Sequence, residues 1–173
     1  MSPRFVLIGP PGAGKSTIGA ALARRLDTSF SDTDKVIVEK VGKSISDLFV
    51  LDGEATFRSI EQIVVADQLH TENGVLALGG GSVLNEQTQR EIFLSKDTGT
   101  KVVFLDVSIA AAAPRIGFNR DRPLLLGNPR AQWLSLMQER RPIYESLANI
   151  VINTSEITPE ETIDMILSLT EQI

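Results

Sequence analysis

The stretch Gly9-Pro-Pro-Gly12-Ala-Gly14-Lys15-Ser16-Thr17 matches the pattern GxxxxGKS/T in full. The apolar residues 5–8 before it predict a strand, and residues 18–23 after it predict a helix. Glycines let the backbone curl so that N–H groups point at phosphate oxygens, and the helix N-terminus adds a partial positive charge. An ordinary glycine-rich turn is the alternative, but the strand, motif and helix in register favour a loop that binds a nucleoside triphosphate.

Each residue of this loop has an expected role. We expect the Lys15 ammonium to reach the β- and γ-phosphates of the nucleoside triphosphate and the Ser16 hydroxyl to ligate Mg²⁺. Backbone N–H groups of the loop would hold the remaining phosphate oxygens. The predicted nucleotide-binding residues of the loop are Gly12, Ala13, Gly14, Lys15, Ser16 and Thr17.

Outward from the loop, short apolar runs alternate with longer segments of helical periodicity. The predicted strands are Phe5–Ile8, Ser29–Asp32, Val75–Leu78, Lys101–Leu105 and Ile150–Ile152. The predicted helices are Ser16–Leu26, Asp34–Val41, Glu54–His70, Glu86–Leu94, Ala110–Ile116, Pro129–Leu147 and Pro159–Glu171. This alternation predicts an α/β fold with a doubly wound, mainly parallel five-stranded sheet and helices on both faces. It is the P-loop NTPase arrangement, and we expect the form found in nucleoside monophosphate kinases.

Composition limits the class of protein. A chain of 173 residues with 42% hydrophobic and 23% charged residues predicts one domain over 1–173, and a monomer. The net charge of −5 disfavours nucleic-acid and membrane-surface binding, which need positive charge. The absence of cysteine excludes thiolate chemistry and suits a reducing cytosol, and no signal peptide is evident before the first strand. We therefore expect a cytoplasmic, soluble protein. The single histidine, His70, is expected to be solvated near a helix end.

Two carboxylates follow the second predicted strand. Asp32 and Asp34 are two residues apart, so both can face the phosphate loop at the strand end. One of them could steady Mg²⁺ through its water, and we assign this to Asp32. The other, Asp34, could accept a hydrogen bond from a substrate hydroxyl. Alternatively, Asp34 merely caps the next helix.

Arg58 and Glu61 lie three residues apart on the long helix that begins at Glu54, and they can form an ion pair. The simpler interpretation, a surface pair of little consequence, is favoured when this pair is taken alone. The functional interpretation is that Glu61 fixes the guanidinium of Arg58 for the carboxylate of a small ligand.

Three consecutive glycines, Gly79–Gly81, end the third predicted strand. They give up backbone entropy and packing, so something must approach that backbone closely. In open α/β sheets, ligands bind beyond the carboxyl ends of the strands. The phosphate loop, the two aspartates and the glycines all fall at this edge, which predicts one shared site.

Six arginines lie between Arg115 and Arg141, and this window carries a charge of +4 while the rest of the chain carries −9. A mobile loop over about 116–129 is expected to close as a lid over the transferring phosphate. For Arg130 and Arg141 a solvated basic face is the favoured interpretation. We expect Asp106 to be a strand-end cap rather than a metal ligand, and Trp133 to pack in the core rather than stack on a base.

The ordered set of motifs resembles the shikimate kinase family. It comprises GPPGAGKST, DTD at 32–34, GEATFRSIE at 53–61, LGGGSV at 78–83, RPLL at 122–125 and ERRPIYE at 139–145. The resemblance implies Mg²⁺-dependent transfer of the ATP γ-phosphoryl group to the 3-hydroxyl of shikimate, in aromatic amino-acid biosynthesis. Small-molecule substrates, and no nucleic acid or membrane, are the expected partners.

The resemblance also implies roles for single residues. Asp34 would hold the reacting hydroxyl, Arg58 and Arg140 would grip the shikimate carboxylate, and the Gly80 backbone would donate to ring substituents. Arg122 would be the lid arginine on the phosphates, so that Lys15, Asp34 and Arg122 form the catalytic set. Arg115 corresponds to a residue that can stack on adenine. The chain departs from many family members because it has no arginine after Arg141, which predicts backbone or apolar contacts to adenine from residues 153–159.

Other functions remain as alternatives at this stage. A nucleoside monophosphate kinase is disfavoured because two arginines suit a carboxylate acceptor. A gluconate kinase is disfavoured only by the GExxFRxxE and triple-glycine motifs. A regulatory nucleotide-binding module without catalysis is disfavoured because Lys15, Ser16, Asp34, Arg58 and Arg122 are all present.

Overall fold

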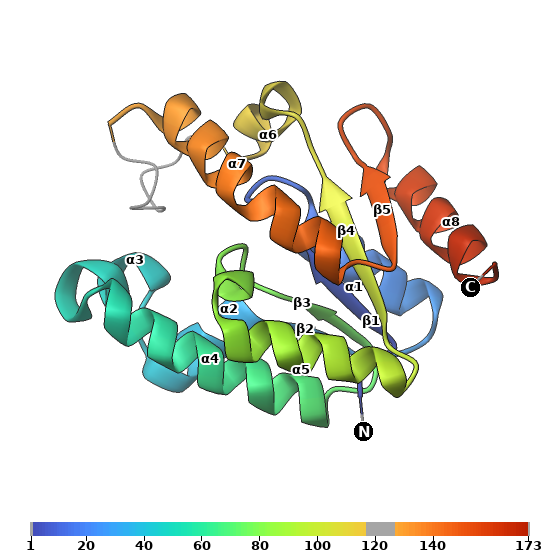
Figure 1. The fold of residues 1–173 in the computed structure, drawn as a ribbon, viewed down its shortest axis with the longest axis horizontal. Helices are drawn as coiled ribbons and strands as arrows, with labels where there is room; N and C mark the ends of the chain where they lie inside the picture. The colour runs from blue at the N-terminus through green and yellow to red at the C-terminus, as the bar shows by residue number, and fades with distance from the viewer. Residues whose placement is uncertain (1, 117–126, 173) are drawn as a thin grey trace.

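A computed structural model describes residues 2–116 and 127–172 (Figure 1). Within them the chain forms a parallel sheet in the order β2-β3-β1-β4-β5. The strands are β1 (Phe5–Ile8), β2 (Phe30–Asp32), β3 (Val75–Ala77), β4 (Lys101–Asp106) and β5 (Ile150–Asn153). The predicted α/β fold with a five-stranded parallel sheet is confirmed. Most of the predicted lid loop, including Arg120 and Arg122, lies outside the described residues.

Helices cover both faces of the sheet (Figure 1). The longer ones are α1 (Lys15–Arg25), α2 (Thr33–Val41), α4 (Glu54–Thr71), α5 (Glu86–Asp97), α6 (Ile109–Ile116), α7 (Pro129–Leu147) and α8 (Pro159–Thr170). The helices α1 and α8 pack against each other on one face, whereas α5 and α7 both contact β4 on the other. None of the helices in the described part of the chain is long and apolar enough to cross a membrane.

The sheet is built on continuous apolar strands. Every residue of β1 and β3 is buried, because helices cover both faces and neither face can be polar. Phe5 of β1 lies opposite Val75 of β3 on one side and Lys101 of β4 on the other. This register brings the carboxyl ends of β1, β2 and β3 to one edge, where the phosphate loop and the glycines emerge.

A second, smaller core lies beside the main one. It consists of four buried side chains from α2, α4 and the turn between them: Ile37, Leu48, Phe57 and Val64. The helix α4, which carries Arg58, is therefore anchored in both cores, because its Val65 and Leu69 belong to the large core around β1 and β4.

The predicted boundaries of the longer elements hold to within three residues, and β1 and α7 agree at both ends. The N-terminal signal of α8 is a capping box between Thr158 and Glu161, with Pro159 in the first turn. Three short segments were not predicted: α3 (Ile45–Asp47), the π-helical turn η1 (Leu48–Asp52) and the 3₁₀ turn η2 (Ser82–Leu84). Segments of three to five residues are too short to show a helical period, so their absence from the prediction follows from their length.

Candidate active site

The phosphate loop curls around its own lysine. Gly12 and Gly14 have φ values of 82° and 92°, a region that side chains with a Cβ rarely adopt. The Lys15 ammonium donates to the carbonyl oxygens of Gly9 at 2.8 Å and Pro10 at 3.0 Å. The loop therefore places a positive charge across its own opening, beside the N-terminus of α1.

The loop forms one wall of a cavity of about 430 Å³. Most residues that we predicted to bind the nucleotide or the metal ion line this cavity. Two of the residues that we predicted to bind the phosphoryl acceptor, Asp34 and Gly80, also line it. The predicted residues in the lining are Gly12, Ala13, Gly14, Lys15, Ser16, Thr17, Asp32, Asp34, Gly80 and Arg115. At the carboxyl edge of the sheet the phosphate loop, the two aspartates and Gly80 thus share one cavity, whereas Arg58 and Arg140 are not among its lining residues.

Asp32 and Asp34 are used differently. Asp32 accepts hydrogen bonds from the Ser16 hydroxyl at 2.5 Å and from the backbone N–H of Asp34 at 3.0 Å. Asp32 is therefore the N-cap of α2, and the alternative in which Asp34 caps that helix is wrong. With the cap supplied by Asp32, the carboxylate of Asp34 lines the cavity next to Gly79.

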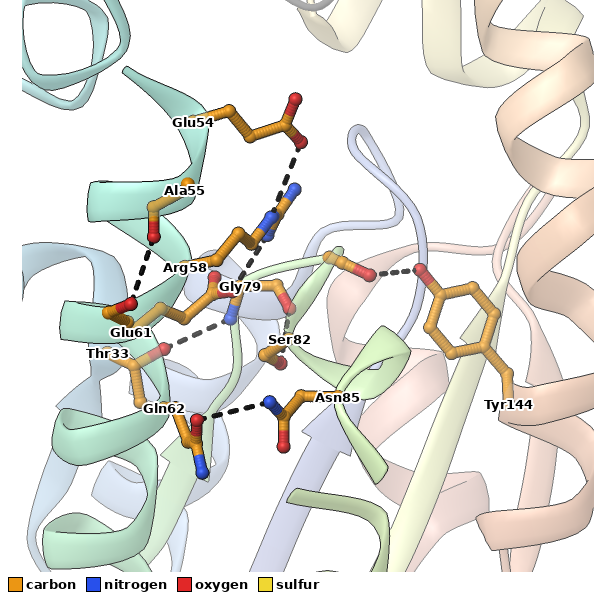
Figure 2. A network of polar contacts seen from close by, with 12 residues as sticks. Thr33, Glu54, Ala55, Arg58, Glu61, Gln62, Gly79, Ser82, Asn85 and Tyr144 are labelled. Carbon is orange, nitrogen blue, oxygen red and sulfur yellow. Dashed lines mark hydrogen bonds and ion pairs between the residues drawn. The ribbon is translucent and has the colours of Figure 1, made fainter. Parts of the chain in front are cut away.

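Arg58 has three neighbours on its own helix, and Figure 2 shows two of them, Glu54 and Glu61. Its guanidinium donates to Glu61 at 2.7 Å, lies 3.6 Å from a carboxylate oxygen of Glu54, and sits 5.2 Å from the centre of the Phe57 ring. The Glu61 side chain is only 4% exposed, so the interpretation as a surface pair is wrong. Burial raises the pKa of Glu61, while the charge of Arg58 and its hydrogen bond oppose that rise.

The three glycines make room for these side chains. A Cβ on Gly79 would lie 2.7 Å from an Asp34 carboxylate oxygen and 2.9 Å from one of Glu61. A Cβ on Gly81 would lie 2.5 Å from both terminal nitrogens of Arg58. The groups that approach this backbone closely, as the sequence required, are therefore the predicted acceptor-binding side chains themselves.

Arg140 reaches the same loop from α7. Its terminal nitrogen would lie 3.5 Å from a Cβ on Gly80, and the residue is 6% exposed. Its Nε is buried without a hydrogen-bond partner among the described residues. A buried guanidinium with an unsatisfied donor, beside Arg58 across a loop of glycines, makes a site suited to an anion.

At the other end of the cavity, Arg115 binds the protein backbone. It donates to the carbonyl oxygens of Gly12 at 3.2 Å and Thr154 at 2.7 Å, which ties the phosphate loop to the segment after β5. Ile157 and Pro159 of that segment also line the cavity. The prediction that adenine meets apolar or backbone groups there has matching surfaces and stays a prediction.

The structure also shows the surroundings of Arg141, Asp106 and Trp133, three residues near the site. The Arg141 side chain is 39% exposed, as expected of a solvated residue, but its charge is paired, because it donates two hydrogen bonds to Asp106 at 2.7 and 2.8 Å. Asp106 also accepts from the N–H of Val107 at the strand end, as expected of a cap. Trp133 packs in the core at 2% exposure, as predicted, and its indole N–H donates to the carbonyl of Pro11 in the phosphate loop.

Sequence reasoning missed two residues that touch the acceptor side. Glu54 contacts Arg58, and the hydroxyl of Tyr144 donates to the carbonyl of Gly80 at 2.6 Å (Figure 2). Spacing contained a signal for each, since Glu54 is four residues before Arg58 and Tyr144 is four residues after Arg140. The bond from Tyr144 to Gly80 itself spans 64 positions and has no local signal.

Comparison with known proteins agrees with this geometry. The family model for shikimate kinase matches residues 11–171. A shikimate kinase of Thermobifida fusca is 52% identical over 95% of this chain and 92% of its own length. A shikimate kinase of Streptomyces coelicolor is 44% identical over 98% of this chain and 96% of its own length. The shikimate kinase of Acinetobacter baumannii, solved in complex with shikimate, superposes with a TM-score of 0.91 at 30% identity over 99% of this chain and 94% of that one. The chain therefore belongs to the shikimate kinase family, whose members are kinases that use ATP.

Proposed function

We propose that this chain transfers the γ-phosphoryl group of ATP to the 3-hydroxyl of shikimate in the cavity described above. One observation carries the residue assignments. Asp34, Arg58 and Arg140 all approach the glycine loop, and two of the residues there, Asp34 and Gly80, line the cavity that the phosphate loop also lines. The γ-phosphate of ATP and the hydroxyl of shikimate would therefore lie close together, and this positioning is the main requirement of phosphoryl transfer.

The donor side is assigned to the phosphate loop. Backbone N–H groups from Gly12 to Thr17 would hold the phosphates, and the Lys15 ammonium would leave its present carbonyl partners for the β- and γ-oxygens. Arg115 would lie against adenine together with Ile157 and Pro159. Arg122, outside the described residues, is proposed to approach the transferring phosphate from the lid.

The metal assignment is supported by the donor set. The Ser16 hydroxyl and the Asp32 carboxylate lie 2.5 Å apart beside the phosphate loop, and oxygen donors of this kind suit Mg²⁺. The described residues contain no group of three carboxylate or histidine ligands, so the remaining ligands would be water and phosphate oxygens. Ser16 would bind the ion directly and Asp32 would bind its water. When bound, Mg²⁺ supplies positive charge next to the polyphosphate oxygens.

The acceptor side is assigned to the two arginines. Arg58, already oriented by Glu61, and Arg140, with a buried unsatisfied donor, would bind the shikimate carboxylate. The Gly80 backbone would donate to a ring substituent. Asp34 would accept a hydrogen bond from the reacting hydroxyl and take its proton as the bond to phosphorus forms.

The assembly and location follow as proposals. We propose that the protein acts as a monomer. The lack of cysteine suits a reducing compartment, and we propose the cytoplasm.

The test is an ADP-release assay with ATP, Mg²⁺ and, in turn, shikimate, gluconate and AMP. Turnover is expected with shikimate alone, and equal turnover on gluconate would refute the proposal. Arg58→Ala should raise the Kd of shikimate at least tenfold, because a charge-assisted contact is lost, and should leave that of ATP within twofold. Arg90→Ala, which removes an exposed arginine of α5, is the matched control and should change neither.

A further inference from the structure

Tyr144 is buried at the junction of α7 and the glycine loop. Its side chain is fully buried, and its ring stacks on Phe104 of β4 with centroids 5.0 Å apart. Its hydroxyl donates to the carbonyl oxygen of Gly80 at 2.6 Å (Figure 2). The ring is therefore fixed by the sheet while the hydroxyl holds the middle glycine.

The three glycine carbonyls have different partners. That of Gly79 accepts from the N–H and hydroxyl of Ser82, and that of Gly81 accepts from the N–H of Leu84. Both partners lie within the loop or the turn after it. Only the Gly80 carbonyl is bound from another element, and that element is α7. Because glycines carry no Cβ to restrict their backbone, such an outside bond helps to hold the loop in one conformation.

Tyr144 also meets Arg140, one helical turn before it on α7. A terminal nitrogen of Arg140 would lie 3.5 Å from a Cβ on Gly80, the residue whose carbonyl accepts from Tyr144. Burial raises the pKa of Tyr144 to about 12 although the charge of Arg140 opposes that rise, so the hydroxyl stays protonated and remains a donor throughout the assay range. Tyr144 and Arg140 thus approach the same glycine from one helix.

We propose that Tyr144 is a positioning residue for the acceptor, which sets the distance between the Arg140 guanidinium and the Gly80 backbone. A buried tyrosine hydroxyl needs some acceptor, and any carbonyl would satisfy it. Tyr144 binds the same middle glycine that the buried Arg140 approaches, which points to a role beyond satisfying the hydroxyl. The inference rests on the proposed function, because it uses the acceptor-binding roles of Gly80 and Arg140.

The test compares Tyr144→Phe with a matched control. Phenylalanine keeps the ring on Phe104 and removes only the hydroxyl. The control is Thr100→Val, because Thr100 is equally buried and its hydroxyl donates to the Pro3 carbonyl at 2.7 Å, near the opposite end of β4. Each variant is measured for its Kd toward shikimate and ATP by titration calorimetry, its kcat, and its Tm.

Positioning predicts a rise of about tenfold in the shikimate Kd of Tyr144→Phe, with the ATP Kd within twofold. The same ratio is expected at pH 6 and pH 9, because the hydroxyl does not titrate between them. Thr100→Val should lose a comparable amount of Tm and change neither Kd. Equal weakening of ATP and shikimate, or an unchanged shikimate Kd, would overturn the role of Tyr144.

Arg140→Met separates this inference from the proposed function. A large loss of shikimate affinity in Arg140→Met, with none in Tyr144→Phe, would remove the positioning role alone. An unchanged shikimate Kd in Arg140→Met would refute the acceptor assignment itself, and the inference with it.

Discussion

Replacing Gly81 with alanine is expected to weaken shikimate binding without weakening the fold. Gly81 has φ −93° and ψ −5°, a conformation that alanine adopts without strain. The added Cβ would lie 2.5 Å from both terminal nitrogens of Arg58 and 2.8 Å from its central carbon. Backbone geometry therefore permits the substitution, and only the Arg58 guanidinium has to move.

The size of the effect follows from that distance. An ordinary contact begins at 3.4 Å, so the guanidinium must retreat by about 1 Å, a misplacement that can cost up to about 100-fold in a positioned site. Glu61 at 2.7 Å and Glu54 at 3.6 Å resist the retreat. We expect the shikimate Kd to rise between about tenfold and 100-fold. Because alanine restricts the unfolded chain, Tm should hold or rise, by the equivalent of about 0.4–1 kcal/mol.

A double-mutant cycle with Arg58→Ala assigns the effect. Shikimate and ATP affinities of the wild type, both single variants and the double variant are measured by calorimetry, with Tm by differential scanning calorimetry. Truncation of Arg58 removes the three atoms nearest to the added Cβ, so Gly81→Ala should cost little further in the double variant. Full additivity of the two losses, or an ATP affinity that falls as far as that of shikimate, would refute the reasoning.

Two further variants test the two ends of the site. Burial raises the pKa of Glu61, so its folded form binds a proton more tightly than its unfolded form, and wild-type stability should fall as pH rises from the ordinary carboxyl range through that raised pKa. Glu61→Gln removes this dependence, so its Tm relative to wild type should increase from pH 4 to pH 8, and a pH-independent difference would contradict the assignment. Arg115→Ala removes the hydrogen bonds to Gly12 and Thr154 and should raise the ATP Kd about tenfold with shikimate binding unchanged. Calorimetry with each ligand checks this, and equal losses for both ligands would show that Arg115 acts on the whole fold.

Local patterns predicted the frame of the molecule. Consecutive residues contain the signals for β1, for the phosphate loop and for α7. Each of these elements lies where its signal predicts it. The edge rule for parallel sheets then predicts that Asp34 and the glycines lie together. These features depend on backbone geometry, which short stretches of sequence determine.

The details of the acceptor side depend on packing between distant segments. The spacing of Arg58 and Glu61 indicates a pair, but Glu61 is buried because Gly79, eighteen positions later, leaves space for its carboxylate. Similarly, nothing near Arg141 reveals that Asp106, 35 positions earlier, holds its guanidinium. Such contacts appear only once the helices are placed on the sheet, and they decide which charges are solvated and which are fixed.

The loop of Gly79–Gly81 has a consequence for inhibition of the enzyme. A compound that hydrogen-bonds to this backbone would contact atoms that no substitution except proline removes. Side chains added at Gly79 or Gly81 would collide with Asp34, Glu61 or Arg58 and impair the use of the natural substrate as well. Resistance by single substitution at these positions would therefore carry a cost in fitness, which makes the loop backbone a more durable target than the side chains around the adenine end.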